Sequence, residues 1–466
     1  MYLHPSVSTD KVLSMLKKLK EVDTEIHQFS LYHKDEKLVE FAPAPYSCQD
    51  KRRVNSVSKT FTSTAVGLCY DKGLLKPEDK LISFFPEELT KDADEKIKAL
   101  TLHDLLTMCT ASEDILPSLV NEPDILHQYF TRKHQPMTKE FHYNNSATYM
   151  LSAVVGRVTG GTMFDLLQKE LFPVLGISGT SWPTLDGVTE GAAGLRVSAD
   201  DIAKLMQIYL GKGVYQGKRL LSEEWVEMAT SVQISTQFDN PYEWWTKGYG
   251  YQIWRNKVDG YRACGAIGQY GYVFPSLEMV LGEEAIVGKS DETDDIYYEF
   301  CSDYAGESTV SAEELQHYLD TMYQPLGGDL SSFAGFDRVA QLEKNPMGFT
   351  LAVLRNCGDT VEMELSEGEF AQVLRFGVGH WEENKLFAHH FRPELYSLTI
   401  PRREIVHFAA SCTVNAEGAL EVLLRFRDCA FRYNMVVTTG EPMTIHFDTP
   451  SLLPDANHIT GHFISK

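Results

Sequence analysis

RVNSVSKTFTS, residues 53–63, leads into a mostly apolar run, residues 64–70, that is followed by Asp-Lys-Gly at 71–73. This pattern predicts a helix, and Gly73 stands where a helix end commonly places a left-handed residue. Ser56 and Lys59 lie three residues apart in the stretch. Because residues at this spacing share one face of a helix, we expect the serine hydroxyl and the lysine amine to meet.

A serine hydroxyl next to a lysine amine has a chemical use. The hydroxyl is a weak nucleophile until a base removes its proton. A lysine can act as that base when burial lowers the pKa of its amine, and free N–H groups at a helix start can hold a developing oxyanion. The pattern alone is weak, since Ser14 and Lys17 have the same spacing in a basic stretch typical of a solvated helix face.

Composition and charge limit the classes of function. The formal net charge of −22 over 466 residues argues against nucleic acid or an anionic membrane as partner. The eight cysteines occur singly with no C-x-x-C pair, so we expect no metal and no cofactor. The start of the sequence shows no secretion signal, and no apolar run reaches the ~20 residues that span a bilayer. We therefore expect a soluble, cytoplasmic protein that acts on a small molecule.

A second candidate for the site is Tyr143-Asn144-Asn145, the one Tyr-x-Asn among 22 tyrosines. It precedes a predicted helix over 146–158. Tyr143 could transfer protons if Lys59 lies beside it, and Asn145 could hold the lysine or a substrate carbonyl by hydrogen bonds. The structural alternative is a turn residue followed by a buried tyrosine.

Periodicity predicts the remaining elements up to residue 326. Helices are expected over 9–20, 102–110 (with Thr101 as N-cap and His103 in a structural role), 202–210 (with Ser198 as N-cap), 295–304 and 312–323. Strands are expected over 26–33, 38–41, 248–254 and 261–275, the last interrupted by glycines 265, 268 and 271. Residues 74–86 are expected to form a loop.

The character of the sequence changes after Gly327-Gly328, a candidate linker. Short strands with turns between them predict a small all-β domain, sandwich or barrel, over 327–466. The expected strands cover 350–354, 360–365, 397–400, 405–414, 420–427, 434–438, 443–447 and 459–464. The pair His389-His390 is interpreted as incidental rather than as a metal site.

In these motifs and their order the chain resembles the serine β-lactamase and penicillin-binding-protein superfamily, in its class C β-lactamase-like and esterase-like branch. The resemblance covers about residues 8–304. Its pieces are SVSKTFTS at 56–63, LHDLLT at 102–107, YNN at 143–145, GLRVSADD at 194–201 and GAIGQ at 265–269. It implies an α/β (α+β) catalytic domain over 1–326, with an antiparallel sheet flanked by helices and a helical subdomain.

The resemblance also implies roles. Ser56 would be the acylated nucleophile, Lys59 its base, and Tyr143 a partner in acid/base work, with Asn145 orienting Lys59 or the substrate. Backbone N–H groups of Ser56 and Gln269 would form the oxyanion hole.

The chain departs from the family in the third motif, which usually reads Lys or His, any residue, Gly on a strand that lines the site. The best register places Ala266-Ile267-Gly268 there, so the cation that greets a substrate carboxylate is missing. Arg262, close in sequence, is a candidate substitute.

These residues favour a serine hydrolase that acts through an acyl-enzyme on a small ester or amide. One alternative is a β-lactamase or a D-amino-acid peptidase or carboxypeptidase. A second alternative is a non-catalytic ligand-binding scaffold of the same fold, which the altered third motif favours and the intact Ser56, Lys59 and Tyr143 oppose. The C-terminal β domain is expected to cap the cleft or to mediate contacts in a homo-oligomer.

Overall fold

The computed structural model describes residues 1–88, 95–119, 122–135, 137–236, 242–345, 348–387, 405–448 and 458–464. The chain forms two compact units. Unit 1 comprises Met1–Ala42 and Ser47–Gln316, and unit 2 comprises Pro43–Tyr46 and His317–Lys466.

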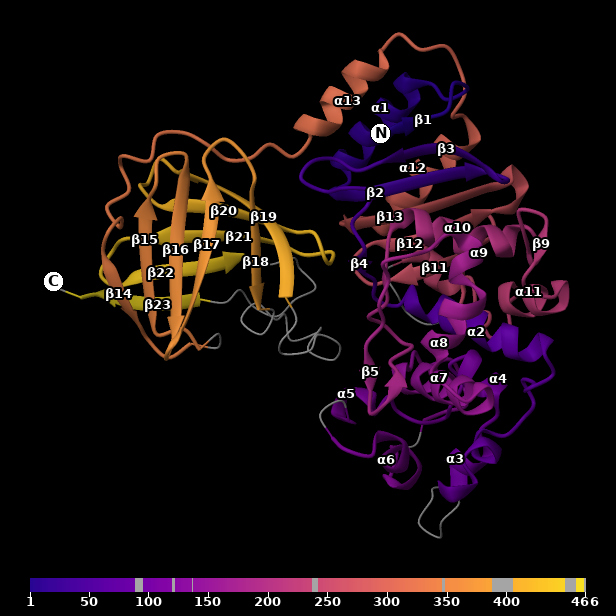
Figure 1. Cartoon of the computed structure of the whole chain (residues 1–466). Helices are drawn as coiled ribbons and strands as arrows, with labels where there is room; N and C mark the ends of the chain where they lie inside the picture. Colours follow the sequence, from indigo (N-terminus) through magenta and orange to yellow (C-terminus); the bar gives the residue numbers. More distant parts are fainter. Residues whose placement is uncertain are drawn as a thin grey trace. The chain divides into compact units, whose positions relative to one another are not determined.

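Unit 1 contains an antiparallel sheet of seven strands, in the order β1-β3-β2-β13-β12-β11-β10, which Figure 1 draws above α2 (Ser58–Asp71) and α7 (Asn145–Thr159). Its strands are β1 (Tyr2–Leu3), β2 (Thr24–His33), β3 (Glu36–Phe41), β10 (Trp254–Arg255), β11 (Tyr261–Gly265), β12 (Gln269–Phe274) and β13 (Met279–Val287). The hairpin of β11 and β12 ends in the turn 266–268, where Gly265 pairs with Gln269.

Helices cover both faces of this sheet. Gly282 of β13 lies against the backbone of α10 (Ala199–Leu210), whereas the next residue, Glu283, accepts a hydrogen bond from Tyr297 of α12 (Ser290–Ser302). Because successive side chains of a strand point to opposite faces, α10 and α12 lie on opposite sides of the sheet. Helix α1 (Thr9–Glu21) packs beside α12.

The helical part of unit 1 is built around α2 (Ser58–Asp71), whose residues 58–69 are all buried. It packs against α7 (Asn145–Thr159). The other helices of unit 1 are α3 (Glu95–Ala99), α4 (Leu102–Leu106), α5 (Leu116–Leu119), α6 (Ile125–Thr131), α8 (Met163–Glu170), α9 (Phe172–Leu175) and α11 (Glu223–Thr230). Helix α13 (Ala312–Thr321) begins in unit 1 and ends in unit 2. Short strand pairs join β4 (Arg52–Arg53) to β7 (Arg196–Val197), β5 (Thr184–Leu185) to β6 (Val188–Thr189), and β8 (Val214–Tyr215) to β9 (Lys218–Arg219).

Local signals fix the starts of α4 and α10 as the sequence predicts, although α4 ends at Leu106 rather than at residue 110. Thr101 and Ser198 each form a capping box, with Asp104 and Asp201 respectively. The side chain of Asn144 accepts the N–H of Ala147 at the start of α7. His103 hydrogen-bonds the Tyr251 hydroxyl at 2.9 Å, which agrees with the structural role expected for it.

Two predicted strands are wrong. Residues 248–254 bend instead of extending, because Gly248 and Gln252 have positive φ angles of 102° and 60° and the buried Gln252 bonds the carbonyls of Leu105 and Leu106. Residues 261–275 form the two strands β11 and β12 rather than one strand. The expected loop over 74–86 contains the 3₁₀ turns η1 (Leu81–Phe84) and η2 (Pro86–Glu88), and a third such turn, η3 (Glu243–Thr246), precedes β10.

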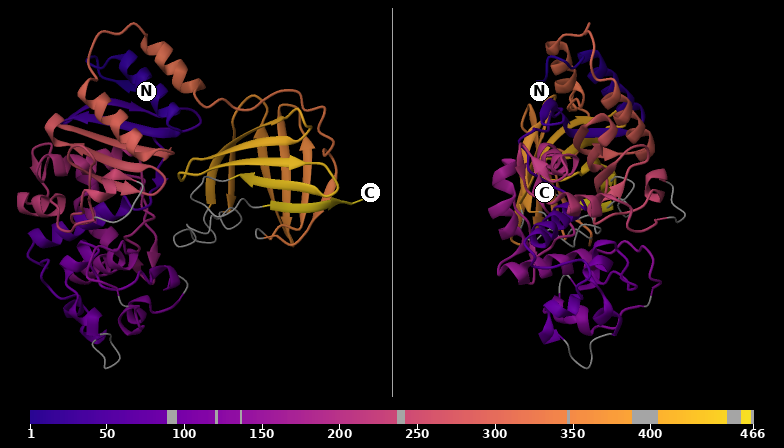
Figure 2. Two further views of the ribbon diagram at one scale, coloured as in Figure 1. Left: turned by 180° about the vertical axis from the view of Figure 1, so that it is seen from behind. Right: turned by 90° about the vertical axis from the view of Figure 1, so that its right-hand side faces the viewer.

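Unit 2 is an up-and-down barrel of ten strands, which confirms the predicted all-β domain (Figure 2). Its strands are β14 (Val339–Leu342), β15 (Leu351–Asn356), β16 (Thr360–Glu367), β17 (Phe370–Gly377), β18 (Glu382–Phe387), β19 (Ile405–Val414), β20 (Leu420–Phe426), β21 (Arg432–Thr438), β22 (Met443–Asp448) and β23 (His458–Phe463). β14 pairs with β23, and Gly377 of β17 pairs with Ser411 of β19, so the sheet closes. The predictions missed β14, β17 and β18. The expected strand 397–400 and the pair His389-His390 lie outside the described residues.

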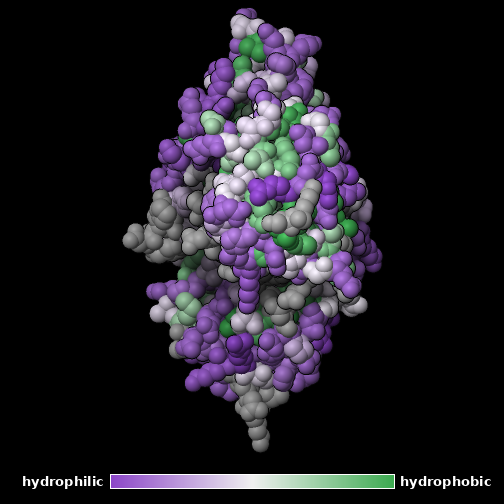
Figure 3. Space-filling model, turned by 90° about the vertical axis from the view of Figure 1, so that its left-hand side faces the viewer, coloured by the Kyte–Doolittle hydropathy of each residue, from purple (hydrophilic) through white to green (hydrophobic). Residues whose placement is uncertain are grey.

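Hydrophilic side chains cover most of the face drawn in Figure 3, as the formal charge of −22 leads one to expect. Within the described part of the chain, helices long and apolar enough to cross a membrane are not found.

Candidate active site

Ser56 lies in the turn immediately before α2, and Lys59 lies in the first turn of that helix. The N–H of Lys59 donates to the Ser56 carbonyl at 2.9 Å, so the backbone is already coiled between them. This coiling brings Lys59 Nζ to 3.1 Å from Ser56 Oγ. The expected meeting of hydroxyl and amine is therefore present.

The Lys59 amine is held from three sides within the interior. In addition to Ser56, Nζ donates to Asn145 Oδ1 at 2.7 Å and to the Ala192 carbonyl at 2.9 Å. Lys59 is 1% exposed, and burial lowers the pKa of its amine to about 7. Nearby Asp114 opposes this shift. The amine can thus exist in the neutral form that accepts a proton at neutral pH.

Tyr143 lies beside the same two groups. Lys59 Nζ lies 4.8 Å from the centre of its ring and 3.1 Å from Ser56 Oγ, so the ring is close to both groups. The residue as a whole is 38% exposed, but its hydroxyl is buried, and burial raises the pKa of the phenol. The phenol is therefore protonated at neutral pH and can donate a proton.

Asn145 is oriented by Asp114, a residue that the sequence analysis missed. Asp114 Oδ2 accepts the Asn145 backbone N–H at 3.0 Å and the Asn145 Nδ2 amide at 2.8 Å. Since Nδ2 faces this carboxylate, Oδ1 of the same amide is turned toward Lys59. No spacing rule pointed to Asp114, because it lies in an irregular segment 31 residues before Asn145.

The turn between β11 and β12 closes the site on the side of the sheet. A Cβ on Gly265 would lie 3.3 Å from the backbone nitrogen of Val57, so the end of β11 approaches the residue after Ser56 closely. Ala266, the first turn residue, is exposed, and its carbonyl accepts the Asn55 Nδ2 amide at 3.0 Å. Ile267 has a φ of 83°, a strained value for a β-branched residue.

Gln269 joins this turn to the segment before Ser56. The buried Gln269 side chain accepts the Asn55 N–H at 2.6 Å and donates to the Arg53 carbonyl at 3.2 Å. Its main chain pairs with Gly265 on one side and Glu284 on the other, within the sheet. Gln269 is thus brought to the site through its side chain.

The expected register of the third motif is corrected by this geometry. Ala266-Ile267-Gly268 form the turn and do not lie on a strand. Gly268 backs onto β13, since a Cβ there would lie 2.9 Å from the nitrogen of Val287. The three-residue stretch of β11 that ends in a glycine close to Ser56 is Ala263-Cys264-Gly265.

Arg262 does not replace the missing cation. It is fully buried, donates to both carboxylate oxygens of Asp294, and lies under the ring of Trp244 at 4.5 Å. Its charge is therefore neutralised inside the layer between the sheet and α12.

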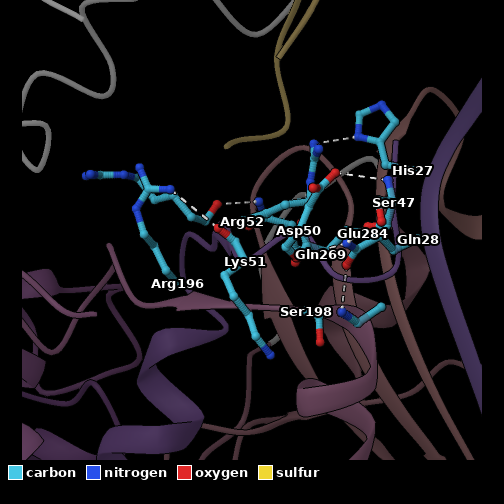
Figure 4. A network of polar contacts seen from close by, with 12 residues as sticks. His27, Gln28, Ser47, Asp50, Lys51, Arg52, Arg196, Ser198, Gln269 and Glu284 are labelled. Atoms are coloured by element: carbon cyan, nitrogen blue, oxygen red, sulfur yellow. Dashed lines mark hydrogen bonds and ion pairs between the residues drawn. The ribbon is translucent and has the colours of Figure 1, made fainter. Parts of the chain in front are cut away.

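A polar network fixes the segment that leads to Ser56 (Figure 4). Gln28 of β2 donates to the carbonyls of Ser47 and Asp50 at 2.6 and 2.9 Å. Arg52, fully buried, donates to Glu284 at 2.7 Å and reaches His27 at 2.8 Å. These contacts attach the chain before the nucleophile to the central strands of the sheet.

The beta-lactamase family profile matches residues 33–282, more than half of the chain. The chain belongs to the beta-lactamase family, within the serine β-lactamase and penicillin-binding-protein superfamily, which confirms the resemblance seen in its motifs.

Relatives of several kinds share this fold. The 6-aminohexanoate-dimer hydrolase of Paenarthrobacter ureafaciens is 25% identical over 244 residues, which cover 48% of this chain and 62% of that enzyme. The penicillin-binding protein homologue of Caulobacter crescentus matches with a TM-score of 0.50 and 14% identity, over 63% of this chain and 98% of that chain. The octameric penicillin-binding protein homologue of Pyrococcus abyssi matches with a TM-score of 0.50 and 13% identity, over 97% of this chain and 99% of that chain.

Over the ranges that the structure describes, no group of three or more histidine, cysteine, aspartate or glutamate side chains is placed to hold a metal ion.

Proposed function

We propose that this chain is a serine hydrolase that cleaves small ester or amide substrates through an acyl-enzyme on Ser56. One observation carries the proposal: a buried lysine whose pKa is lowered to about 7 lies 3.1 Å from the hydroxyl of Ser56. A lysine that only stabilised the fold would gain more from a carboxylate partner than from a serine hydroxyl and two neutral carbonyl oxygens.

In the proposed acylation step, the neutral Lys59 amine takes the proton of Ser56 Oγ while that oxygen forms a bond to the substrate carbonyl carbon. The resulting tetrahedral oxyanion collapses and the bond to the leaving group breaks. Tyr143 gives its proton to the leaving atom and is reprotonated from Lys59, so no proton is lost or gained overall. In deacylation, water takes the place of the leaving group. Tyr143 accepts a proton from the attacking water and passes its own proton to Lys59, which returns a proton to Ser56 Oγ as the bond between Ser56 and the acyl group breaks.

We assign the oxyanion hole to the backbone N–H groups of Ser56 and Ala266. The exposed Ala266 follows Gly265, which approaches Val57 closely, and its carbonyl is held by Asn55. The main chain of Gln269 is paired within the sheet, so we assign Gln269 a positioning role in place of the donor role first expected. We assign Gly268 to shaping the turn. Removing one oxyanion-hole donor that is held in place in this way lowers kcat by about 10²–10³-fold.

The proposed substrates carry no carboxylate at the reacting end. A β-lactamase or a D-amino-acid peptidase uses a cation to bind the substrate carboxylate. In the stretch of β11 that ends at Gly265, the two residues before the glycine are the uncharged Ala263 and Cys264. Arg262 is engaged by Asp294. A neutral ester or amide therefore fits this site better.

The experiment compares hydrolysis of p-nitrophenyl butyrate and a chromogenic cephalosporin by the full chain and by Ser56→Ala. We expect ester turnover that is lost in Ser56→Ala, and little turnover of the cephalosporin. Fast cephalosporin turnover would favour the β-lactamase alternative, and no turnover of either compound by folded protein would favour a non-catalytic scaffold.

For unit 2 we propose a role in assembly of a homo-oligomer, by likeness to the octameric Pyrococcus abyssi homologue, which is matched over nearly its full length. A monomeric mass for the full chain in light scattering would count against this role.

A further inference from the structure

A cavity of about 470 Å³ lies beside the candidate nucleophile. It is lined by Glu140, Phe141, His142, Tyr143, Ser235, Trp245 and Trp254. Its volume falls within the range of about 300–1,000 Å³ that small-molecule sites occupy. Tyr143 belongs both to this wall and to the catalytic group, so the cavity and the reacting atoms share one side chain.

Three nearly parallel rings form the apolar wall. The rings of Tyr143 and Trp254 lie 6.2 Å apart with planes at 15°, and those of Trp254 and Trp245 lie 5.6 Å apart with planes at 13°. Phe141 and Tyr249 meet Trp254 edge-on, at 5.3 and 4.8 Å. Because these contacts hold Trp254 from behind, the wall is rigid before any ligand arrives, which lowers the entropic cost of binding.

The charges around the cavity exclude one kind of ligand. Among the described residues that line it, none is a lysine or an arginine, and Glu140 contributes a carboxylate at an exposed position. The nearby Arg262 is bound to Asp294 beneath Trp244. An anionic group would meet the Glu140 carboxylate and no lysine or arginine among these described lining residues, whereas the faces of the rings attract flat apolar groups and tolerate cations.

The position of Tyr143 determines which half of a substrate lies in the cavity. The Tyr143 ring centre lies 4.8 Å from Lys59 Nζ, which is 3.1 Å from Ser56 Oγ, and in the proposed mechanism the Tyr143 hydroxyl protonates the leaving atom. Whatever is attached to that atom must therefore lie against Tyr143 and its neighbours. We propose that the cavity binds an aromatic group without negative charge, carried on the leaving-group side of the substrate. This proposal deepens the proposed function and rests on it.

The test keeps the chemistry constant and changes only the shape of the leaving group. 2-Phenylethyl acetate and n-hexyl acetate release primary alcohols of similar acidity, so a difference in kcat/KM reports recognition. We expect the full-length enzyme to prefer the aromatic ester about tenfold or more, as one flat group stacked on indole rings warrants. We expect the analogue with a para-carboxylate on the ring to lose that preference.

Substitution of a wall residue locates the effect. Trp245 is half-buried, and Trp245→Leu should bring the aromatic-to-alkyl ratio close to one. Trp381→Leu is the matched control, because Trp381 is also half-buried but belongs to unit 2. It should keep the ratio of the wild type. An unchanged ratio in Trp245→Leu would overturn the proposal.

A second series separates the two halves of the substrate. Methyl 3-phenylpropanoate and methyl heptanoate carry the same difference on the acyl side. A Trp245-dependent preference in this series, without one in the acetate series, would overturn the assignment to the leaving group.

Turnover and a direct binding measurement together distinguish a failure of the cavity proposal from a failure of the proposed hydrolase function. If Ser56→Ala abolishes turnover of both acetates but no aromatic preference exists, the cavity proposal fails and the hydrolase proposal stands. If neither acetate is turned over, saturable quenching of tryptophan fluorescence by 2-phenylethanol, lost in Trp245→Leu, would still support the cavity. Its absence from the wild type would overturn the cavity proposal as well.

Discussion

The lowered pKa of Lys59 gives the sharpest expectation for the pH dependence of activity. An amine with the ordinary pKa of 10.5 is neutral in only about one molecule in 3,000 at pH 7, whereas an amine with a pKa of about 7 is neutral in about half. This difference corresponds to roughly 5 kcal/mol, which burial imposes on the protonated form. If the neutral amine is the base, kcat/KM rises with pH, about tenfold per unit below pH 6, and levels off above pH 8.

The assay is hydrolysis of p-nitrophenyl butyrate between pH 5 and 9, corrected for the uncatalysed rate. Asp114→Asn provides the perturbation, because Asp114 carries the negative charge that contributes most to holding the pKa of Lys59 up. Removing that charge should move the acid limb of the profile to lower pH. Asp165→Asn is the control, since Asp165 caps the exposed start of α8 and does not act on Lys59.

Two results would refute this reasoning. A rate that keeps rising up to pH 9 would mean that Lys59 retains an ordinary pKa. An acid limb that stays in place or moves to higher pH in Asp114→Asn would mean that the charge of Asp114 does not raise the pKa of the titrating group.

Three further perturbations test other parts of the site. Gln269→Leu removes the hydrogen bonds to the Asn55 N–H and the Arg53 carbonyl, each worth about 0.5–1.5 kcal/mol, so we expect a lower Tm and a lower kcat with little change in KM, and an unchanged kcat would count against a positioning role. Gly265→Ala forces a Cβ to 2.8 Å from Gln269 Oε1, so kcat should fall by about 10²-fold, and an unchanged kcat would show that the turn does not position the reacting groups. Lys59→Met should change the pH dependence of stability: between pH 7 and 10.5 Lys59 binds more protons in the unfolded chain than in the folded one, so its contribution to the free energy of unfolding rises with pH in this window, and thermal melts should show a smaller rise in the variant than in the wild type.

The sequence predicted most of the elements whose signals are local. The helix after Ser56 and the N-caps at Thr101 and Ser198 depend on residues within four positions of one another, and each lies where expected. The meeting of Ser56, Lys59 and Tyr143 followed from one helical turn and a resemblance in motif order.

The failures of prediction concern contacts between distant parts of the chain. Asp114 orients Asn145 from an irregular segment, and Gln269 acts through a side chain that reaches residues 53–55 across the sheet. Arg262 looked available because its partner, Asp294, is 32 residues away on a helix. Residues 248–254, expected to form a strand, bend because the buried Gln252 side chain donates to two backbone carbonyls of α4. In each case tertiary hydrogen bonds decide the outcome, and local periodicity does not report them.

The central claim is that Ser56 becomes acylated, and mass spectrometry of the trapped intermediate tests it most directly. The full chain would be mixed with excess p-nitrophenyl butyrate, quenched in acid and digested. We expect the mass of one butyryl group on the peptide that contains Ser56 in the wild type, and none on the corresponding peptide of Ser56→Ala. A hydrolysing enzyme that accumulates butyryl on another residue, and still does so in Ser56→Ala, would contradict the claim.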